Sequence, residues 1–570
     1  MEPPALHVPA PPAAASCVSH ADTAWVLVST MLVLLMIPAL GLFEAGLLRA
    51  KNTTSVLTQV FSGAVLMSFL WHIVGFSLVF GDSLVGIIGS PATYPLMIGV
   101  SVDSCFEAWA PTVPKRAFAE FQMMFAAITP LLMTGSFAER MRWSAFVGLM
   151  IGFEVLVYFP VAHWIWGGGW LHRLGTLDFA GGIVIHTTAG VGGVVVAWFI
   201  GPRRLDARGS VSGLQAARTS LHQESPLSTL RRPGLTPLVP IPGSVADALD
   251  TFGDGGPDGH SASPAPCPED AKPLPSTSSA ATSAAPGLTA SLLPRTTSAP
   301  QPMRVRRSSR GALLGVDSRA VLAPEESVLS SSMPGLVARL ETVPPSSLPL
   351  TVTGGALLWL GWFGFNGGSA MSAGPLAAVA VSNTQAGAVA GGVVWMAWSC
   401  VLHRRQVGRT RLSLAATVNG IIAGLAGITP AAGYISGHYA LLSGAIFGVV
   451  GLVAEWLVKH WLRIDDALDV GAVHGATGAT GALAIGLFAS RAVNAAGADG
   501  LLEGGGAAQL GSQAAGVAVA AAWSATATAL ICVGLQRSVG LRVEPEEEQE
   551  GLDIADHDEP AYEWLLRSGS

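Results

Sequence analysis

Eleven apolar stretches, each close to 20 residues long, dominate this sequence and limit what it can fold into. A helix of roughly 20 apolar residues is long enough to cross the hydrocarbon core of a bilayer. Only 12% of the 570 residues are charged, against about 25% in an ordinary soluble domain, so the chain cannot cover a water-facing surface. We therefore expect an all-α integral membrane protein with eleven transmembrane helices, over 24–43, 56–80, 117–138, 143–165, 181–201, 348–366, 376–402, 412–430, 437–460, 468–488 and 511–535.

The lysines and arginines of the short connections predict the orientation, because these residues favour the inner side of a membrane. If the N-terminus lies outside, four of them fall on the outer side (Lys115, Arg116, Arg173 and Arg491). Fifteen fall on the inner side: Arg49, Lys51, Arg140, Arg142, Arg203, Arg204, Arg208, Arg404, Arg405, Arg409, Arg411, Lys459, Arg463, Arg537 and Arg542. This asymmetry predicts the N-terminus outside and the C-terminus inside.

Three segments lie outside the predicted helices. Residues 1–23 form an extracellular leader in this interpretation, and residues 203–347 are too rich in Ser, Pro, Ala and Gly to bury a core, which predicts a disordered cytoplasmic loop. The loop separates helices 1–5 (24–202) from helices 6–11 (348–536), and a cytoplasmic tail follows (537–570) with nine acidic residues from Glu544 to Glu559. The loop also carries four arginines (304, 306, 307 and 310) around Ser308 and Ser309, which suit anionic lipid, phosphorylation or plain solvation.

The five cysteines are scattered (Cys17, Cys105, Cys267, Cys400 and Cys532), and their spacing implies neither a disulfide framework nor a metal site. No cofactor is expected. The sequence also argues against an enzyme, because it has no nucleophile–base pair, phosphate-binding loop or metal-ligand cluster.

Two histidines inside predicted helices are the strongest functional signal, because ionisable groups within a membrane are costly. His186 lies in the fifth helix and His474 in the tenth, and each is followed four residues later by Gly and preceded by an Asp (Asp178 and Asp469). A single buried histidine is most simply a hydrogen-bonded core residue. Two at matched places predict a five-plus-five inverted repeat with a pair of pore imidazoles at its midplane, where burial keeps them neutral.

Aromatic and hydroxyl side chains collect at the predicted outer ends of three helices, the third, fourth and sixth. Phe125, Trp166, Phe365 and Ser369 would lie at this level. Aromatic faces attract a small cation, and a hydroxyl adds an acceptor for an N–H donor. An interfacial aromatic belt is the alternative explanation for Trp166.

Ordered motifs over most of the chain resemble the signatures of the Amt/Mep/Rhesus family of ammonium transporters, and of its Amt-type members in particular. The similarity runs from about residue 24 to 202 and from about 348 to 562. It rests on Gly46-Leu-Leu-Arg-Ala-Lys-Asn52, Ala138-Glu-Arg140, Trp166-Gly-Gly-Gly, Leu177-Asp-Phe-Ala-Gly-Gly-Ile-Val-Ile-His186, Gly361-Trp-Phe-Gly-Phe-Asn-Gly-Gly-Ser369, Asp469-Val-Gly-Ala-Val-His-Gly475 and the tail around Gly540-Leu-Arg-Val543 and Glu550-Gly-Leu-Asp553.

The resemblance implies a role for each residue type. Trp166, Phe125 and Ser369 would recruit ammonium at the outer mouth. Asp178 would organise this site from beneath, together with the carbonyl near Ala180. Phe125 and Phe365 would form a stacked gate, and the pore behind it would be lined by His186, His474 and Trp362.

The resemblance also implies partners. These are ammonium or ammonia, methylammonium as an analogue, the lipid bilayer of the plasma membrane, a homotrimer with one pore per subunit, and a PII-type or kinase regulator at the cytoplasmic face, with no nucleic acid. Two alternatives stay open: an ammonium sensor with little flux, and a Rhesus-type gas channel. The chain departs from the family pattern at Met123 and Met124, beside the gate, and in its long inner loop.

Overall fold

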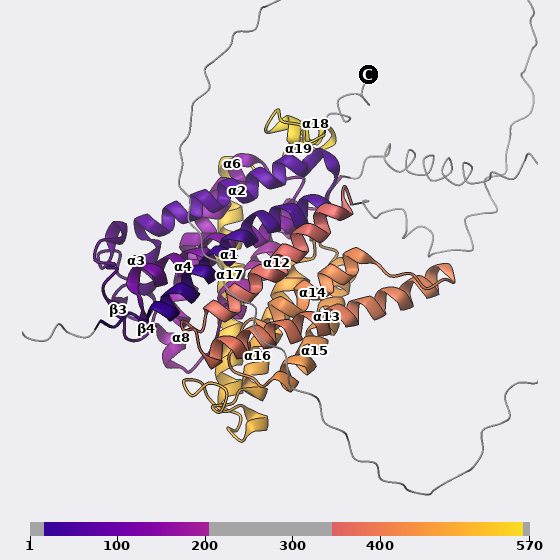
Figure 1. Cartoon of the computed structure of the whole chain (residues 1–570). Helices are drawn as coiled ribbons and strands as arrows, with labels where there is room; N and C mark the ends of the chain where they lie inside the picture. The colour runs from indigo at the N-terminus through magenta and orange to yellow at the C-terminus, as the bar shows by residue number, and fades with distance from the viewer. Residues whose placement is uncertain (1–15, 205–344, 563–570) are drawn as a thin grey trace, which may run out of the picture. The chain divides into compact units, whose positions relative to one another are not determined.

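The computed structural model describes residues 16–204 and 345–562, and these two stretches belong to one compact unit. The predicted loop with its arginine cluster, the first part of the leader and the end of the tail lie outside the described residues. Helices from the two stretches lie side by side in a bundle, with α1 packed along α12 (Figure 1). The described residues are helical apart from their connections and two short hairpins.

The first stretch contains five long helical segments, and several of them are divided by 3-10 or π-helical turns (η). In chain order these are α1 (His20–Leu47), η1 (Ala50–Asn52), α2 (Thr53–Leu70), η2 (Trp71–Gly75), α3 (Phe76–Phe80), η3 (Pro95–Met97), α4 (Lys115–Ile128), η4 (Pro130–Met133), α5 (Thr134–Phe137), α6 (Trp143–Phe153), η5 (Glu154–Tyr158), α7 (Phe159–Ile165), α8 (Trp170–Arg173), η6 (Gly182–Thr187) and α9 (Thr188–Ile200).

The second stretch contains the remaining long helices and the helices of the tail. Its helices are α12 (Leu348–Gly368), α13 (Pro375–Val407), α14 (Leu414–Ile428), α15 (Gly437–Trp456), η7 (Leu457–Trp461), η8 (Gly471–Ala476), α16 (Thr477–Phe488), η9 (Leu501–Glu503), α17 (Ala508–Ser538), α18 (Pro545–Glu550) and α19 (Leu552–Ala555).

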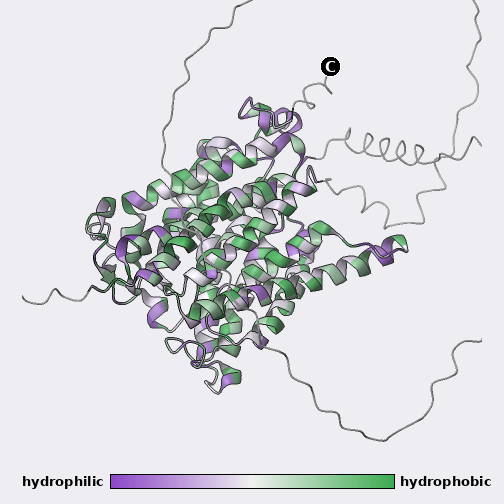
Figure 2. Cartoon of the chain, in the orientation of Figure 1, coloured by the Kyte–Doolittle hydropathy of each residue, from purple (hydrophilic) through white to green (hydrophobic). Residues whose placement is uncertain are grey.

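Nine helical segments of the described residues are long and apolar enough to cross a membrane. Helix α14 is apolar but only 15 residues long, and η8 with α16 covers the predicted stretch 468–488. Each of the eleven predicted stretches therefore coincides with helix. Apolar residues cover these helices, and hydrophilic residues gather around α18 and at the tip between α13 and α14 (Figure 2).

Local chemistry explains where several helices begin and end. The hydroxyls of Ser19, Ser347 and Ser413 accept hydrogen bonds from backbone N–H groups three residues later, which satisfies donors that a first helical turn leaves free. Helix α13 ends at Gly408, whose φ of +72° suits a residue without a Cβ.

Two β-hairpins lie at one end of the bundle. Strand β1 (Ser83–Leu84) pairs antiparallel with β2 (Ile88–Gly89), and β3 (Cys105–Phe106) pairs with β4 (Ala110–Pro114). A disulfide joins Cys17 to Cys105 and ties the segment before α1 to the second hairpin. The cysteine spacing gave no indication of this bond, because its partners are 88 residues apart and meet only through the fold.

A buried network of charged groups joins several helices at the other end of the bundle. Glu139 pairs with Arg49 at 3.0 Å and with Arg203 at 3.3 Å, and Arg203 also pairs with Asp465 at 2.9 Å. Burial alone would raise the pKa of Glu139, but the two guanidinium groups outweigh it and lower this pKa. Arg203 likewise overrides burial and lowers the pKa of Asp465 to about 2. The Ala138-Glu-Arg140 motif therefore has a structural role.

The acidic tail packs against this same end (Figure 1). Asp553 accepts a hydrogen bond from the Ser55 backbone N–H at 2.8 Å, and the Leu552 N–H donates to Asn52 Oδ1 at 2.9 Å. Glu548 is buried and pairs with Arg542 at 2.8 Å. Glu548 also accepts a hydrogen bond from the Arg204 backbone N–H at 2.7 Å. The sequence predicted a soluble acidic segment, whereas two of its acids, Glu548 and Asp553, bind the tail to the rest of the chain.

Candidate functional site

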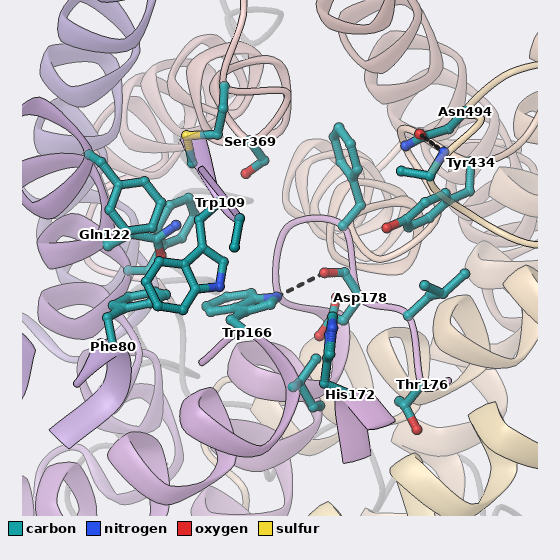
Figure 3. A pocket seen from close by; sticks show the side chains of 18 of the residues that line it. Phe80, Trp109, Gln122, Trp166, His172, Thr176, Asp178, Ser369, Tyr434 and Asn494 are labelled. Atoms are coloured by element: carbon teal, nitrogen blue, oxygen red, sulfur yellow. Dashed lines mark hydrogen bonds between the residues drawn. The ribbon is translucent and has the colours of Figure 1, made fainter. Parts of the chain in front are cut away.

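A pocket of about 340 Å³ opens at the end of the bundle that carries the hairpins, and we call it the outer pocket because the sequence predicts this end to lie outside. Four of the predicted site residues line it: Phe125 from α4, Trp166 at the end of α7, Asp178 before η6 and Ser369 after α12. Trp166 lies in the middle of this pocket, with Asp178 beside it and Ser369 across from it (Figure 3). The rings of Phe125 and Trp166 meet edge to face with their centroids 6.0 Å apart.

The carboxylate of Asp178 holds the chain turn that starts η6. Its two oxygens accept four backbone N–H groups, from residues 181 to 184, at 2.7–3.0 Å. Its own carbonyl accepts the Trp166 indole N–H at 2.9 Å. The four bonds to the carboxylate are charge-assisted and strong, so the Asp178 side chain fixes the start of the helix that carries His186. Its backbone carbonyl positions the indole, and Ala180 lies buried within the same turn.

Two phenyl rings separate the outer pocket from the interior. The centroids of Phe125 and Phe365 lie 4.6 Å apart with an angle of 78° between the ring planes. The rings of the predicted stacked gate therefore meet edge to face, and their role as a gate stays a prediction. This geometry is the one that the ring quadrupoles favour.

A narrow cavity of about 20 Å³ lies behind these rings and contains both histidines. His186, His474, Trp362 and Phe365 line it among aliphatic side chains. The two Nδ1 atoms are 3.2 Å apart, and His186 stacks against Trp362 with centroids 5.5 Å apart. Trp362 is itself fixed by an indole hydrogen bond to Thr429 at 2.8 Å.

The glycine that follows each histidine by four residues makes room for the opposite half. A Cβ on Gly190 would lie 2.3 Å from backbone atoms of Gly475, next to His474. A Cβ on Gly478 would lie 2.7 Å from the Cβ of His186. The repeated spacing seen in the sequence is therefore explained by close contact between the η6–α9 and η8–α16 helices.

The aspartate that corresponds to Asp178 in the second half is Asp466, eight residues before its histidine, and not Asp469. Asp466 is fully buried, and its Oδ2 accepts the Gly471 N–H at the start of η8, at 2.7 Å. Asp469 instead pairs with Lys459 at 2.6 Å. Burial and the nearby Asp469 charge raise the pKa of Asp466 to about 6.

Three further residues were not singled out from the sequence, and two of them lie at the site. Trp109 and Gln122 line the outer pocket, and Glu154 is buried in η5 without a hydrogen-bond partner among the described residues. Gln122 could have been found from its helical spacing to Phe125, three residues later. Trp109 lies in the β3–β4 hairpin, whose path no local pattern predicts. Nothing in the structure explains Glu154.

Comparison with known proteins gives a consistent result. The model of the Ammonium Transporter Family matches residues 24–221 and 331–562. Ammonium transporter 1 of Dictyostelium discoideum is 37% identical over 550 residues, which cover 96% of this chain and 89% of that protein. The ammonium transporter Amt1 of Archaeoglobus fulgidus is 31% identical over 545 residues, with 95% and 100% covered.

Solved structures agree with these sequence matches. The crystal structure of Saccharomyces cerevisiae Mep2 superposes with a TM-score of 0.63 at 25% identity, and the match covers 93% of this chain and 88% of that one. Candida albicans Mep2 gives the same score and coverage at 26% identity. With the family model matching most of its length, and both halves of the bundle included, this chain belongs to the ammonium transporter family, whose members are membrane transporters and not enzymes.

Proposed function

We propose that this chain carries ammonium across a membrane by recruiting the cation in the outer pocket and conducting it as ammonia past the histidine pair. The observation that supports this proposal most is the order of the parts. The outer pocket, the Phe125–Phe365 rings and the histidine cavity follow one another through shared residues, since Phe125 lines the first and Phe365 the last.

Recruitment of the cation rests on Trp166, Phe125 and Ser369. The indole and phenyl faces attract the positive charge. The Ser369 hydroxyl donates its proton to the Phe365 carbonyl at 2.9 Å, so its oxygen remains an acceptor for an ammonium N–H. Asp178 and the turn at Ala180 hold Trp166 in place and add negative charge beneath the site.

Deprotonation at the phenyl gate follows from the size and polarity of what lies behind it. The inner cavity is about 20 Å³ and is lined mainly by apolar side chains. An unpaired cation is far costlier to bury there than neutral ammonia, which needs only replacement hydrogen bonds. The proton therefore passes to water in the outer pocket before the nitrogen passes Phe125 and Phe365, and net transport is either of ammonia alone or of ammonia with a proton that follows separately.

The histidine pair supplies those replacement hydrogen bonds. With 3.2 Å between the two Nδ1 atoms, one imidazole donates the shared proton and the other accepts it. The Nε2 atom of His186 has no partner within the described chain, so it is free to bond a small solute in the cavity. Trp362 holds the imidazole plane of His186 by stacking.

The wider architecture belongs to the same proposal. We infer eleven membrane crossings in a five-plus-five inverted repeat, with the N-terminus outside. The Cys17–Cys105 disulfide supports this orientation, because such bonds persist in oxidising compartments outside the cytoplasm. The plasma membrane, a homotrimer with one pore per subunit, and a PII-type or kinase regulator at the inner face, where the acidic tail packs, complete the proposal.

Uptake in a yeast strain without its own ammonium transporters tests the function. We expect growth on low ammonium and saturable uptake of labelled methylammonium. Binding without growth would instead support a sensor. Gas flux that does not depend on Trp166 or Ser369 would support a Rhesus-type channel.

The histidine assignment has its own test. His186→Ala and His474→Ala should each lower methylammonium uptake at least tenfold, with the protein still present at the membrane, and unchanged uptake in both variants would refute the pore pair. Currents on supported membranes separate the two modes of transport. A current proportional to flux indicates a coupled proton, and zero current at full flux excludes it.

A further inference from the structure

The outer pocket is far larger than the ion that the proposed function assigns to it. Its volume is about 340 Å³, whereas a water-sized molecule takes up roughly 30 Å³. Pockets that bind small organic molecules begin at about 300 Å³. The cavity behind the phenyl rings is only about 20 Å³. The outer pocket can therefore hold a solute that cannot enter the pore.

The additional space has an aromatic wall that the recruitment residues do not use. Trp109, Phe80 and Phe118 line the pocket together. The Trp109 ring lies 5.2 Å from that of Phe80 and 6.3 Å from that of Phe118, nearly parallel to the latter at 12°. The Cys17–Cys105 disulfide anchors the hairpin on which Trp109 lies. With Phe125, Trp166, Phe179 and Tyr434, seven Phe, Trp and Tyr side chains of the described residues line one cavity.

Beside His172, Thr176, Tyr434 and Asn494, which also offer hydrogen-bond donors, the pocket contains an amide acceptor and a carboxylate. Gln122 is 8% exposed, and its Oε1 has no hydrogen-bond partner among the described residues. It lies on the same side of the pocket as Trp109 and Phe80 (Figure 3). Asp178 carries the negative charge, and among the described residues no lysine or arginine lines the pocket. A cation with methyl groups and an N–H donor fits this combination of acceptors and aromatic faces.

We propose that the outer pocket binds small tertiary alkylammonium ions, of which trimethylammonium is the simplest, and that these ions block the pore without passing it. The methyl groups contact Trp109, Phe80 and Phe118, and the single N–H donates to Gln122 Oε1. The ion stops at Phe125 and Phe365 because the cavity beyond them is too small. Binding does not depend on the proposed function. Only the consequence that a bound ion blocks ammonium transport rests on the proposed function.

Calorimetry on the purified full-length chain tests the binding directly, without transport. Trimethylammonium chloride should give saturable heat, and sodium chloride at equal ionic strength should give none. Trp109→Leu should weaken binding about fivefold or more, as expected for the loss of a desolvated cation–π contact. Gln122→Leu should weaken it by a similar factor, and tetramethylammonium, which lacks the N–H, should bind equally to wild type and Gln122→Leu.

Trp198→Leu is the matched control, because Trp198 is 65% exposed on α9 and does not line the pocket. It should bind trimethylammonium as the wild type does. A thermal melt of each variant shows whether it is folded. If Trp109→Leu does not fold, Trp109→Phe replaces it, and it should retain part of the affinity because it keeps an aromatic ring. No saturable heat in the wild type, or equal affinity in folded Trp109→Leu and wild type, overturns the proposal.

Uptake measurements then test the block. Trimethylammonium should raise the apparent KM for methylammonium and leave the maximal rate unchanged. In Trp109→Leu, the ratio of the inhibition constant for trimethylammonium to the KM for methylammonium should be higher than in the wild type. Binding without any inhibition of measurable uptake overturns the block. A chain that binds trimethylammonium but shows no uptake contradicts the proposed function and leaves the binding site intact, so the two failures are distinguishable.

Discussion

At the residue scale, Asp178 shows how much a single carboxylate can hold together. It accepts four backbone N–H groups and orients Trp166 through its carbonyl. In Asp178→Asn, one oxygen becomes an NH2 group that faces two N–H donors. We expect methylammonium uptake to fall at least tenfold and the free energy of unfolding to fall by about 3 kcal/mol, since buried hydrogen bonds to a charged group are lost.

Uptake together with thermal unfolding checks this prediction. Asp103→Asn on the exposed outer loop is the control for loss of an acidic charge, and it should change neither. Wild-type uptake in Asp178→Asn would contradict the positioning role.

Asp466 gives a prediction of pH dependence. Its pKa is raised to about 6 in the fold from 3.8, chiefly by burial. The folded state therefore binds this proton more tightly than the unfolded state, and stability is lost as pH rises from about 4 through 6. Asp466→Asn does not titrate, so its stability relative to wild type should increase by about 1–2 kcal/mol between pH 5 and pH 7.5.

Melting temperatures of both proteins at the two pH values measure this difference. The variant also changes the acceptor of the Gly471 N–H, but that effect is the same at each pH. A difference between variant and wild type that does not change with pH would contradict the assignment.

Sequence reasoning selected residues that the fold brings together where a residue type recurs within a local pattern, and their roles stay predictions. His186 and His474, 288 positions apart, meet as expected, and Phe125, Trp166 and Ser369 share a pocket. Sequence reasoning failed for residues whose contacts depend on how distant segments of the chain come together in the fold. The Cys17–Cys105 bond and Trp109 depend on the hairpins of a long outer connection, and Asp466 was passed over because Asp469 lies nearer to its histidine.

At the element scale, the contact between η6–α9 and η8–α16 depends on the absence of side chains. Gly190→Ala would place a Cβ 2.3 Å from the Gly475 backbone, where no rotamer change can relieve the overlap. The helices must separate, so we expect a lower melting temperature and loss of most methylammonium uptake. Gly534→Ala is the matched control, because a Cβ there meets nothing within 4 Å, and helix propensity makes it neutral or slightly stabilising, by up to about 1 kcal/mol.

Purification yield, melting temperature and uptake of the two variants check this prediction. Equal behaviour of Gly190→Ala and Gly534→Ala would show that the helices tolerate separation.

The helices themselves were largely predictable, since length and apolarity determine what can cross a bilayer. Their internal irregularities were not. Both histidines lie in π-helical turns, η6 and η8, and a π-helical turn differs from an α-helix by a single hydrogen-bond shift that leaves no mark in residue periodicity.

At the scale of the whole molecule, both ends of the segment outside the described residues are anchored to one short stretch. The carbonyl of Arg204 accepts a hydrogen bond from Arg49 at 3.3 Å, and the Ser346 N–H donates to the Leu48 carbonyl at 3.1 Å. A short connection can therefore join them. We expect deletion of residues 210–340 to leave the melting temperature unchanged. Methylammonium uptake should stay within about twofold of wild type.

The ten residues that remain between Arg204 and Ser346 after this deletion span up to about 33 Å when extended, which avoids strain at the junction. Deletion of α18 and α19 is the contrasting variant, because it removes the hydrogen bonds to Asn52 and Ser55, and its melting temperature should fall. Lost uptake in a stable 210–340 deletion would assign that segment a role in transport or its regulation.

The crossed glycine contacts have a consequence for inheritance. Gly190 accommodates the backbone beside His474, and Gly478 accommodates His186, so each half of the chain carries the space that the other half's imidazole requires. A larger residue at either glycine is damaging unless the residue that it contacts on the opposite helix changes with it. The codons for Gly190 and Gly475 should therefore vary together, and natural relatives should show either small residues at both positions or paired replacements across this contact.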